Sequence, residues 1–178
     1  MEQLAAFRLW LCCAVMVSRT SDAPSQPATI AGPLEYDGSR YYLLDASTWT
    51  EAQRAAVALG GNLATIDSVE EHQWIYSTFS SFDSTDRHLW IGLADFDAAV
   101  NSPVRADRRL EFRWIAGLSE GYRNWSPVEP NNPASGDPVN PEYYCHIWWP
   151  RDIHRGRLNN YSDRATLFGG PLCGVVEI

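Results

Sequence analysis

Three prolines within eight residues, at Pro127, Pro130 and Pro133, constrain this chain more than any other feature. Proline lacks a backbone N–H and has a fixed φ, so neither a helix nor a central strand tolerates prolines at this density. The segment 126–133 is therefore predicted to be a loop. Each proline also restricts the residue before it to extended conformations, which stiffens the loop around Glu129.

The side chains on either side of the central proline indicate a cation site. Glu129 and Asn131 offer a carboxylate and an amide carbonyl oxygen. Calcium takes about six to eight oxygen ligands of this kind, including water. Glu142 and the later pair Asn159-Asn160 could complete the shell. A solvated loop that binds nothing is the alternative that these residues leave open.

Length and charge restrict the classes of function. A chain of 178 residues suits one domain. Its 45% hydrophobic and 20% charged residues allow a sizeable core. The formal net charge of -8 argues against nucleic-acid binding, which needs a basic face.

The first 23 residues resemble a secretory signal peptide. Arg8 precedes the apolar run 9–17, and Ser21-Asp22-Ala23 resembles a small-residue cleavage site. The run is too short to span a bilayer, so we expect a secreted protein with no transmembrane segment in the mature chain. A buried N-terminal strand or helix is the alternative. Residues 24–33 are predicted to be a linker, and 34–178 the folded domain.

Cysteine usage leaves one question open. Cys12 and Cys13 lie within the predicted signal peptide, which leaves Cys145 and Cys173 in the mature chain. In an oxidising compartment these two residues could form one disulfide. Two free thiols are equally compatible with the sequence.

The remaining pattern predicts two helices among several strands, an α+β arrangement. Capping pairs Thr48/Glu51 and Ser68/Glu71 mark the two helix starts. The strands expected from alternation or apolar runs are a hairpin over 36–44 turning at Asp37-Gly38, then 63–66, 89–93, 111–114, 143–149 and 174–178. Core positions expected from spacing are Trp74, Ile75, Phe79, Trp90, Trp114 and Trp125. The polar stretch 94–110 is predicted to be a long loop, and such loops are usually functional.

An ordered set of short motifs resembles the C-type lectin domain, over roughly residues 34–178. The motifs are Trp49-Thr50-Glu51-Ala52, Leu59-Gly60-Gly61-Asn62-Leu63-Ala64-Thr65-Ile66, Trp90-Ile91-Gly92-Leu93, Phe112-Arg113-Trp114, Asn124-Trp125, Glu129-Pro130-Asn131, Glu142 and Val175-Val176-Glu177. The resemblance implies a double-looped α+β domain with two helices, small antiparallel sheets and a long irregular loop. It also implies calcium-dependent carbohydrate binding rather than an enzyme.

The resemblance assigns roles to the site residues. Glu129, Asn131, Glu142, Asn159 and Asn160 would ligate calcium. Glu129, Asn131, Glu142 and Asn159 would also bind the sugar, the carboxylates as acceptors and the amides as donors. A Glu-Pro-Asn triplet implies mannose- or glucose-type sugars and a cis bond before the proline. Such sites are weak per copy, so oligomers would provide avidity.

Departures from the family pattern give further expectations. The family's long disulfide would need cysteines near Ala56 and Val176, so packing must hold the first helix to the last strand. Cys145 stands one place beyond the usual position, which puts a Cys145–Cys173 bridge off the usual register. Asn160 replaces an anionic ligand, which implies weak calcium binding. A second calcium site around Asp95 is not expected.

An enzyme and a protein-binding module are the two other possible roles for this chain. It shows no nucleophile elbow, metal-binding histidine spacing or phosphate loop, so an enzyme is not expected. A calcium-independent protein-binding module on the same scaffold is the alternative function, since a fold does not fix a function. His146, Trp148 and Trp149 could stack on a sugar. We expect them instead to alternate between the core and the exterior of a strand.

Overall fold

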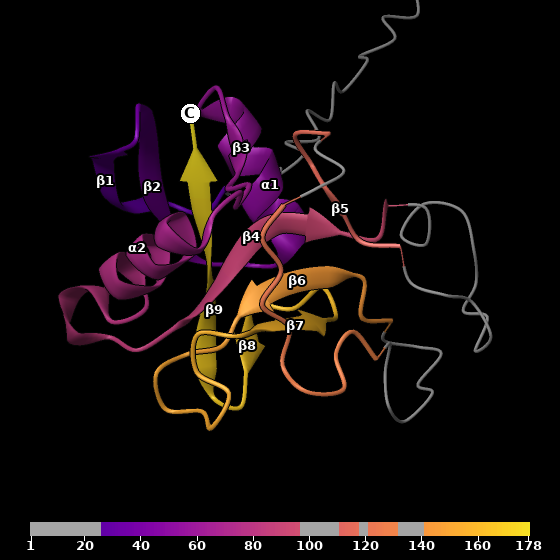
Figure 1. Cartoon of the computed structure of the whole chain (residues 1–178). Coiled ribbons are helices and arrows are strands. Elements are labelled where there is room, and N and C mark those ends of the chain that lie inside the picture. Colours follow the sequence, from indigo (N-terminus) through magenta and orange to yellow (C-terminus); the bar gives the residue numbers. More distant parts are fainter. Residues whose placement is uncertain (1–25, 97–110, 118–120, 132–140) are drawn as a thin grey trace, which may run out of the picture.

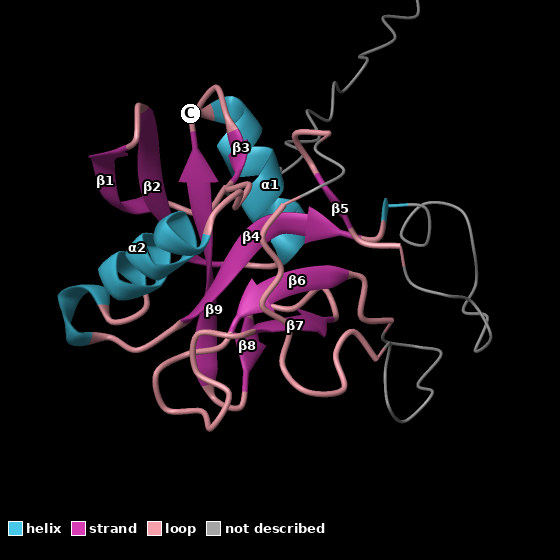
Figure 2. Cartoon of the chain, viewed as in Figure 1, coloured by secondary structure: helices cyan, strands magenta, loops and turns pink. Residues whose placement is uncertain are grey.

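A computed structural model describes residues 26–96, 111–117, 121–131 and 141–178, and its path is shown in Figure 1. The elements of the described chain, in order, are β1 (Thr29–Tyr36), β2 (Ser39–Ala46), α1 (Trp49–Ala58), β3 (Asn62–Leu63), α2 (Val69–Phe79), η1 (Phe82–Ser84), β4 (His88–Ala94), β5 (Arg113–Trp114), β6 (Tyr144–Ile147), β7 (Leu158–Tyr161), β8 (Thr166–Leu167) and β9 (Gly170–Glu177). Two helices and a mixed sheet make this an α+β domain, as expected (Figure 2).

The sheet is organised around its last strand. The strand order is β1-β2-β9-β4-β6-β7, with β3 and β8 also paired to β9 and β5 paired to β4. Only the β4–β9 pair is parallel among the described strands; the other pairs are antiparallel. β9 therefore joins the N-terminal hairpin to the strands that carry the site.

Packing of small residues holds α1 against β9. Ala52, Ala56 and Val176 are fully buried. A Cβ atom added to Gly174 would lie 2.8 Å from the Cβ of Ala52, so only glycine allows this approach. The expected replacement of the family's long disulfide by packing is confirmed.

The two helix starts differ in how they are capped. Thr48 accepts a hydrogen bond from the Glu51 backbone N–H at 3.2 Å, and the Glu51 carboxylate accepts one from the Thr48 N–H at 3.0 Å. This capping box confirms the prediction for α1. Ser68 accepts from the Glu71 N–H, but the Glu71 carboxylate accepts from the N–H of Asp67 instead. The second box is therefore only half formed.

The core lies on both faces of β4. Leu89, Ile91 and Leu93 pack with the apolar side of α2, whereas Trp90 and Ala94 pack toward α1. The indole N–H of Trp90 donates to the Ser47 carbonyl at 3.0 Å, which satisfies its polar atom in the core. All residues of β4 are buried, as the apolar run predicted.

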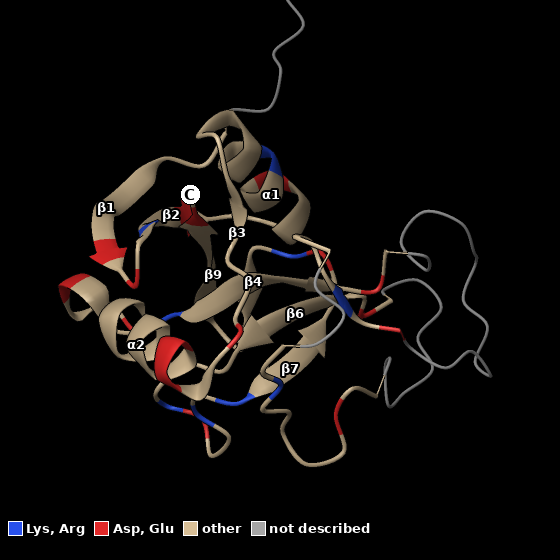
Figure 3. Cartoon of the chain, turned by 45° about the horizontal axis from the view of Figure 1, so that its top comes forward, with Lys and Arg blue, Asp and Glu red and all other residues tan. Residues whose placement is uncertain are grey.

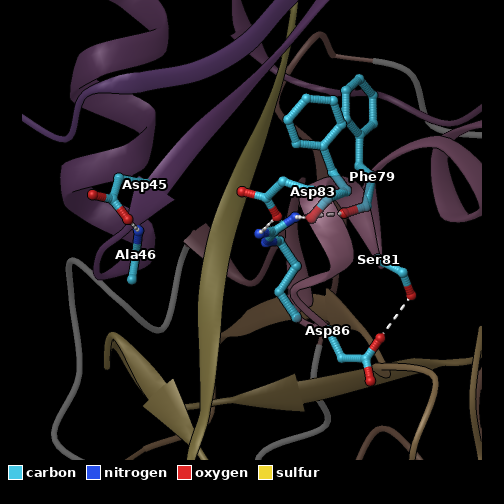
Figure 4. Close-up of polar contacts among 8 residues, drawn as sticks. Asp45, Ala46, Phe79, Ser81, Asp83 and Asp86 are labelled. Atoms are coloured by element: carbon cyan, nitrogen blue, oxygen red, sulfur yellow. Dashed lines mark hydrogen bonds and ion pairs between the residues drawn. The ribbon is translucent and has the colours of Figure 1, made fainter.

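A buried arginine closes the C-terminal end of α2. Arg87 donates through Nη1 to the carbonyl oxygens of Phe79 and Phe82, at 3.3 and 2.9 Å, and through Nη2 to Asp83 at 2.8 Å. Figure 4 shows these contacts, together with the Ser81–Asp86 hydrogen bond. Asp86 also pairs with Arg151 at 2.6 Å, so this end of α2 is joined to the turn after β6.

Several strands differ from the expectations in their bounds or in their presence. β1 begins at Thr29, so part of the segment predicted as a linker belongs to the sheet. Pro33 is tolerated there because β1 is an edge strand. β7 and β8 were not expected, and β5 is shorter than predicted. The predicted signal peptide, 1–23, and most of the long loop 94–110 lie outside the described residues.

Cys145 and Cys173 are both buried and free. They lie on β6 and β9, on either side of β4. With about 4.8 Å between neighbouring strands, these strands are roughly 10 Å apart, beyond the limit of about 7 Å between bridged Cα atoms. The disulfide alternative is therefore wrong for this structure, and burial raises the pKa of the Cys173 thiol to about 11.

Candidate functional site

The proline-rich loop is attached to the start of β7. The carbonyl of Asn124 accepts a hydrogen bond from the Leu158 N–H, and the carbonyl of Leu158 accepts one from the Ser126 N–H, both at 2.8 Å. The Ser126 hydroxyl also donates to the Leu158 carbonyl, at 3.0 Å. Trp125 pairs with Leu158 as an isolated bridge. These contacts place the following residues beside β6 and β7 (Figure 1).

A tight turn leads into the Glu-Pro-Asn triplet. The Glu129 N–H donates to the Ser126 carbonyl at 3.1 Å. Pro127 occupies the second turn position and Val128 the third, with a φ of 71° at Val128. This resembles a type II turn, which usually has glycine at its third position. The bond between Glu129 and Pro130 is cis, as expected.

Two buried oxygen atoms of the triplet lack hydrogen-bond partners. The Asn131 amide donates to Glu129 Oε1 at 2.8 Å, which turns both side chains toward one point. Glu129 Oε2 and Asn131 Oδ1 are buried and unpaired. A buried acceptor without a partner is unfavourable unless an ion or water satisfies it. A carboxylate and an amide oxygen placed together fit a hard cation such as calcium.

Asn160 connects this triplet to Glu142. Its side chain is fully buried. Oδ1 accepts from the Asn131 backbone N–H at 3.1 Å, and Nδ2 donates to the Glu142 carbonyl at 2.9 Å. The structure therefore brings Glu129, Asn131, Glu142 and Asn160 together.

The two carboxylates of the site disfavour each other's charge. Burial raises the pKa of Glu142 to about 7, and the nearby charge of Glu129 adds to this shift. Burial also raises the pKa of Glu129, although a hydrogen bond from Asn131 opposes the shift. A bound cation would favour both charged forms and lower both pKa values.

Asn159 is turned away from the carboxylates. Neighbouring residues of a strand point to opposite faces of the sheet, so Asn159 and Asn160 point in opposite directions. In the register between β7 and β6, Asn159 lies opposite His146 and Asn160 lies opposite Cys145. The Asn159 amide donates to His146 Nε2 at 3.1 Å and to the Asn160 carbonyl at 2.8 Å. His146 is fully buried, and no motif or spacing in the sequence indicates it as the partner of Asn159.

The aromatic run after Glu142 does not form a stacking surface with alternating exposure. His146 and Trp148 are buried, and so are their neighbours Cys145 and Ile147. β6 is therefore covered on both faces, and the predicted alternation of core and exterior is wrong. Trp149 is half-buried and stacks on His88 with 4.9 Å between ring centroids.

Two other acidic side chains have hydrogen-bond donors of their own. Both Asp163 carboxylate oxygens accept from Thr50, at 3.1 Å from its N–H and 2.6 Å from its hydroxyl. Asp95 accepts from the Glu111 N–H. Among the described residues, no group of three or more His, Cys, Asp or Glu side chains could hold a metal. The candidate site has two carboxylates, with amides as its other side-chain ligands.

Two sequence motifs for N-glycosylation meet different surroundings. Asn124-Trp125-Ser126 and Asn160-Tyr161-Ser162 both fit the acceptor pattern. The Asn160 amide nitrogen is buried and donates to a backbone carbonyl, so a glycan there is incompatible with this fold. Asn124 is half-exposed.

In the view of Figure 3, arginine positions are scattered over several elements rather than gathered on one. No helix in the described ranges has the length and apolar character needed to cross a bilayer.

The profile of the Lectin C-type domain matches residues 45–162, which is more than half of the chain. Ladderlectin of Oncorhynchus mykiss is 35% identical over 103 residues, covering 57% of this chain and 49% of ladderlectin, so the match spans about half of that relative.

Two solved structures share the fold. The cow C-type carbohydrate-recognition domain of CD23, solved in the presence of GlcNAc2Man3 oligosaccharide, matches with a TM-score of 0.57 at 22% identity, over 85% of this chain and 97% of that domain. A calcium-independent type II antifreeze protein matches with a TM-score of 0.55 at 20% identity, over 85% of this chain and 95% of that protein. On its fold and on the match over residues 45–162, the chain belongs to the C-type lectin domain family.

Proposed function

We propose that this protein binds carbohydrate in a calcium-dependent manner, with a preference for mannose- or glucose-type sugars. The observation that carries the proposal is the pair of buried, unpaired oxygens, Glu129 Oε2 and Asn131 Oδ1. They lie in a triplet whose side chains are already turned toward each other. An ion bound there would satisfy both atoms.

The proposed ligands are Glu129, Asn131, Glu142, Asn159 and Asn160. When bound, calcium provides coordination positions at which two neighbouring sugar hydroxyls replace water. Glu129 and Glu142 can accept hydrogen bonds from those hydroxyls, and charged acceptors make the stronger bonds. Asn131 can donate through its amide. Asn159 would have to turn from His146 to take part.

The membership in a lectin family supports carbohydrate as the partner class. The related cow CD23 domain is described as a carbohydrate-recognition domain. Secretion follows from the predicted signal peptide over 1–23, and it would expose the site to millimolar calcium outside cells. Because one shallow site binds weakly, we propose that several copies act together. We also propose that the protein binds its sugar without catalysing a reaction.

Calcium titration followed by thermal melting tests the ion site. Calcium should raise the melting temperature of the wild type, because a ligand that binds only the folded state stabilises it. The double variant Glu129→Gln/Glu142→Gln should lose most of this increase. Magnesium serves as the ionic-strength control. An increase of the same size in the double variant would place the ion elsewhere.

Glycan binding tests the carbohydrate partner. Immobilised mannose should retain the protein in calcium and release it in chelator, and free mannose should compete. Retention that is unchanged by chelator would contradict the calcium dependence.

A calcium-independent protein-binding module is the second candidate. It is favoured by the hydrogen bonds of Asn160, which close the site without an ion. The fold neighbour among calcium-independent antifreeze proteins shows that this scaffold occurs without calcium dependence. Absence of any calcium effect on melting, together with absence of glycan binding, would favour this candidate.

A further inference from the structure

A single buried amide joins two segments of the candidate site. Asn160 on β7 accepts from the backbone N–H of Asn131 at 3.1 Å and donates to the carbonyl of Glu142 at 2.9 Å. Its side chain is fully buried, and the two backbone partners belong to half-buried residues. We propose that Asn160 is a positioning residue that keeps the Glu129-Pro130-Asn131 segment assembled in the calcium-free protein. This inference rests on the calcium site proposed above.

The role requires an amide rather than a carboxylate. An amide side chain offers an acceptor and a donor at the same time, whereas an ionised carboxylate only accepts. Aspartate at position 160 could still accept from Asn131. It could not donate to Glu142, and its oxygen would face that carbonyl oxygen instead.

The charge of the site points to the same role. The site already contains the two like charges of Glu129 and Glu142, which repel each other when no ion is bound. A third carboxylate at position 160 would add to this repulsion until a cation neutralised it. The neutral Asn160 avoids the repulsion and supplies two hydrogen bonds in its place.

The amide of Asn160 therefore lowers the affinity for calcium but keeps the Glu129-Pro130-Asn131 segment ordered without the ion. Fewer formal charges weaken calcium binding, while a rigid, preassembled site reduces the ordering that binding must impose. Calcium should thus change the backbone of this segment only slightly in the wild type. In an Asn160→Asp variant, calcium should order the segment and should also bind more tightly.

Hydrogen exchange at the Asn131 amide, followed by NMR, measures the proposed contact directly. The wild type should be protected in chelator, because this N–H is bonded to Asn160. Asn160→Asp keeps an acceptor for this N–H, but the lost bond to Glu142 and the added charge should loosen the segment. The Asn131 amide should therefore exchange about tenfold faster in chelator, and calcium should restore its protection. Asn160→Leu should exchange fast in both conditions, since leucine can neither accept the N–H nor bind the ion.

Asn124→Asp is the matched control. It makes the same chemical change on the segment that leads to Asn131 but leaves both bonds of Asn160 intact. It should therefore keep the exchange rate of the wild type in chelator. If Asn160→Leu does not fold, the comparison of the wild type with the nearly isosteric Asn160→Asp variant tests the inference on its own.

Equal protection of the Asn131 amide in the wild type and in Asn160→Asp, in chelator, would overturn the inference. So would an Asp variant that calcium fails to protect. The outcome is distinguishable from failure of the proposed function. A wild type that is protected in chelator but binds neither calcium nor mannose would leave the positioning role intact. A wild type that binds mannose with calcium but is unprotected without it would remove only the positioning role.

Discussion

Glu129 and Asn131 can make different hydrogen bonds with a sugar hydroxyl. The carboxylate of Glu129 only accepts, whereas the amide of Asn131 can also donate. The structure places them in contact, with the Asn131 amide donating to Glu129 at 2.8 Å. The order of hydrogen-bond donor and acceptor along the triplet is therefore set by Glu129 and Asn131 alone. It can be reversed without changing the net charge of the site.

We expect the double variant Glu129→Gln/Asn131→Asp to shift preference from mannose-type toward galactose-type sugars. The internal hydrogen bond can re-form in the opposite direction, so the fold of the loop should survive. Competition with free mannose and free galactose on a calcium-loaded column measures the preference. An unaltered preference for mannose over galactose would refute this reading. The single variant Glu129→Gln, which lowers the charge, should lose binding and serves as the control.

Val128 is a β-branched residue in a conformation that favours glycine. Its φ is 71° and its side chain is 86% exposed, so it gains little from packing. We expect Val128→Gly to stabilise the protein by up to about 1 kcal/mol, because the strain exceeds the added entropy of the unfolded chain. Urea unfolding measures the change. The same substitution at Val57, an exposed position within α1, should instead destabilise by about 0.5 kcal/mol. Destabilisation at both positions would remove the argument from φ.

At the scale of elements, α1 depends on the residues at its first turn. Thr48 caps the helix, and Asp163 from the segment after β7 binds Thr50. We expect Thr48→Ala to cost about 1 kcal/mol of unfolding free energy, and Thr48→Ser to cost much less because the hydroxyl remains. Chemical denaturation of both variants checks this. Equal losses would mean that the Thr48 methyl group, rather than the cap, stabilises the helix.

Elements with strong local signals were predictable from the sequence. The Asp37-Gly38 turn lies between β1 and β2, the first capping box is complete, and the apolar run of β4 is buried. β7 was missed because Leu-Asn-Asn-Tyr has no strand pattern. Its two asparagine amides are satisfied by contacts with residues distant in sequence.

The candidate site was predictable in part for the same reason. Motif spacing and family resemblance indicated Glu129, Asn131 and Glu142 as neighbours. They could not indicate that Asn159 faces His146 while Asn160 faces Asn131. The face that each residue of β7 presents depends on its register with β6, and register follows from the whole sheet.

At the scale of the whole molecule, pH should affect stability through groups of opposite sign. The pKa of Glu142 is raised to about 7, so its protonated form favours folding. That contribution is complete below the unfolded value of about 4.5 and is lost as pH rises toward 7. Burial lowers the pKa values of His72, His88 and His146, so these residues act in the opposite direction below about pH 6.5.

A comparison with Glu142→Gln isolates the carboxylate. In chelator, the stability of the wild type relative to this variant should decrease as pH rises from about 4.5 to about 7. The histidines are common to both proteins and cancel in the difference. With saturating calcium the trend should reverse, because the ion favours the charged carboxylate. Unfolding midpoints at several pH values provide the measurement. A difference that does not vary with pH in chelator would show that Glu142 titrates normally.

The central position of β9 has a consequence for the order of events during synthesis. Residues 170–177 pair with both β2 and β4, which are more than 40 residues apart in the chain. Until this segment has left the ribosome, both strands present unpaired edges, and such edges invite pairing with other chains. The nascent polypeptide therefore cannot close its sheet progressively from the N-terminus. The sheet edges must remain shielded until residues 170–177 have emerged, after which the sheet closes in one late, non-local step.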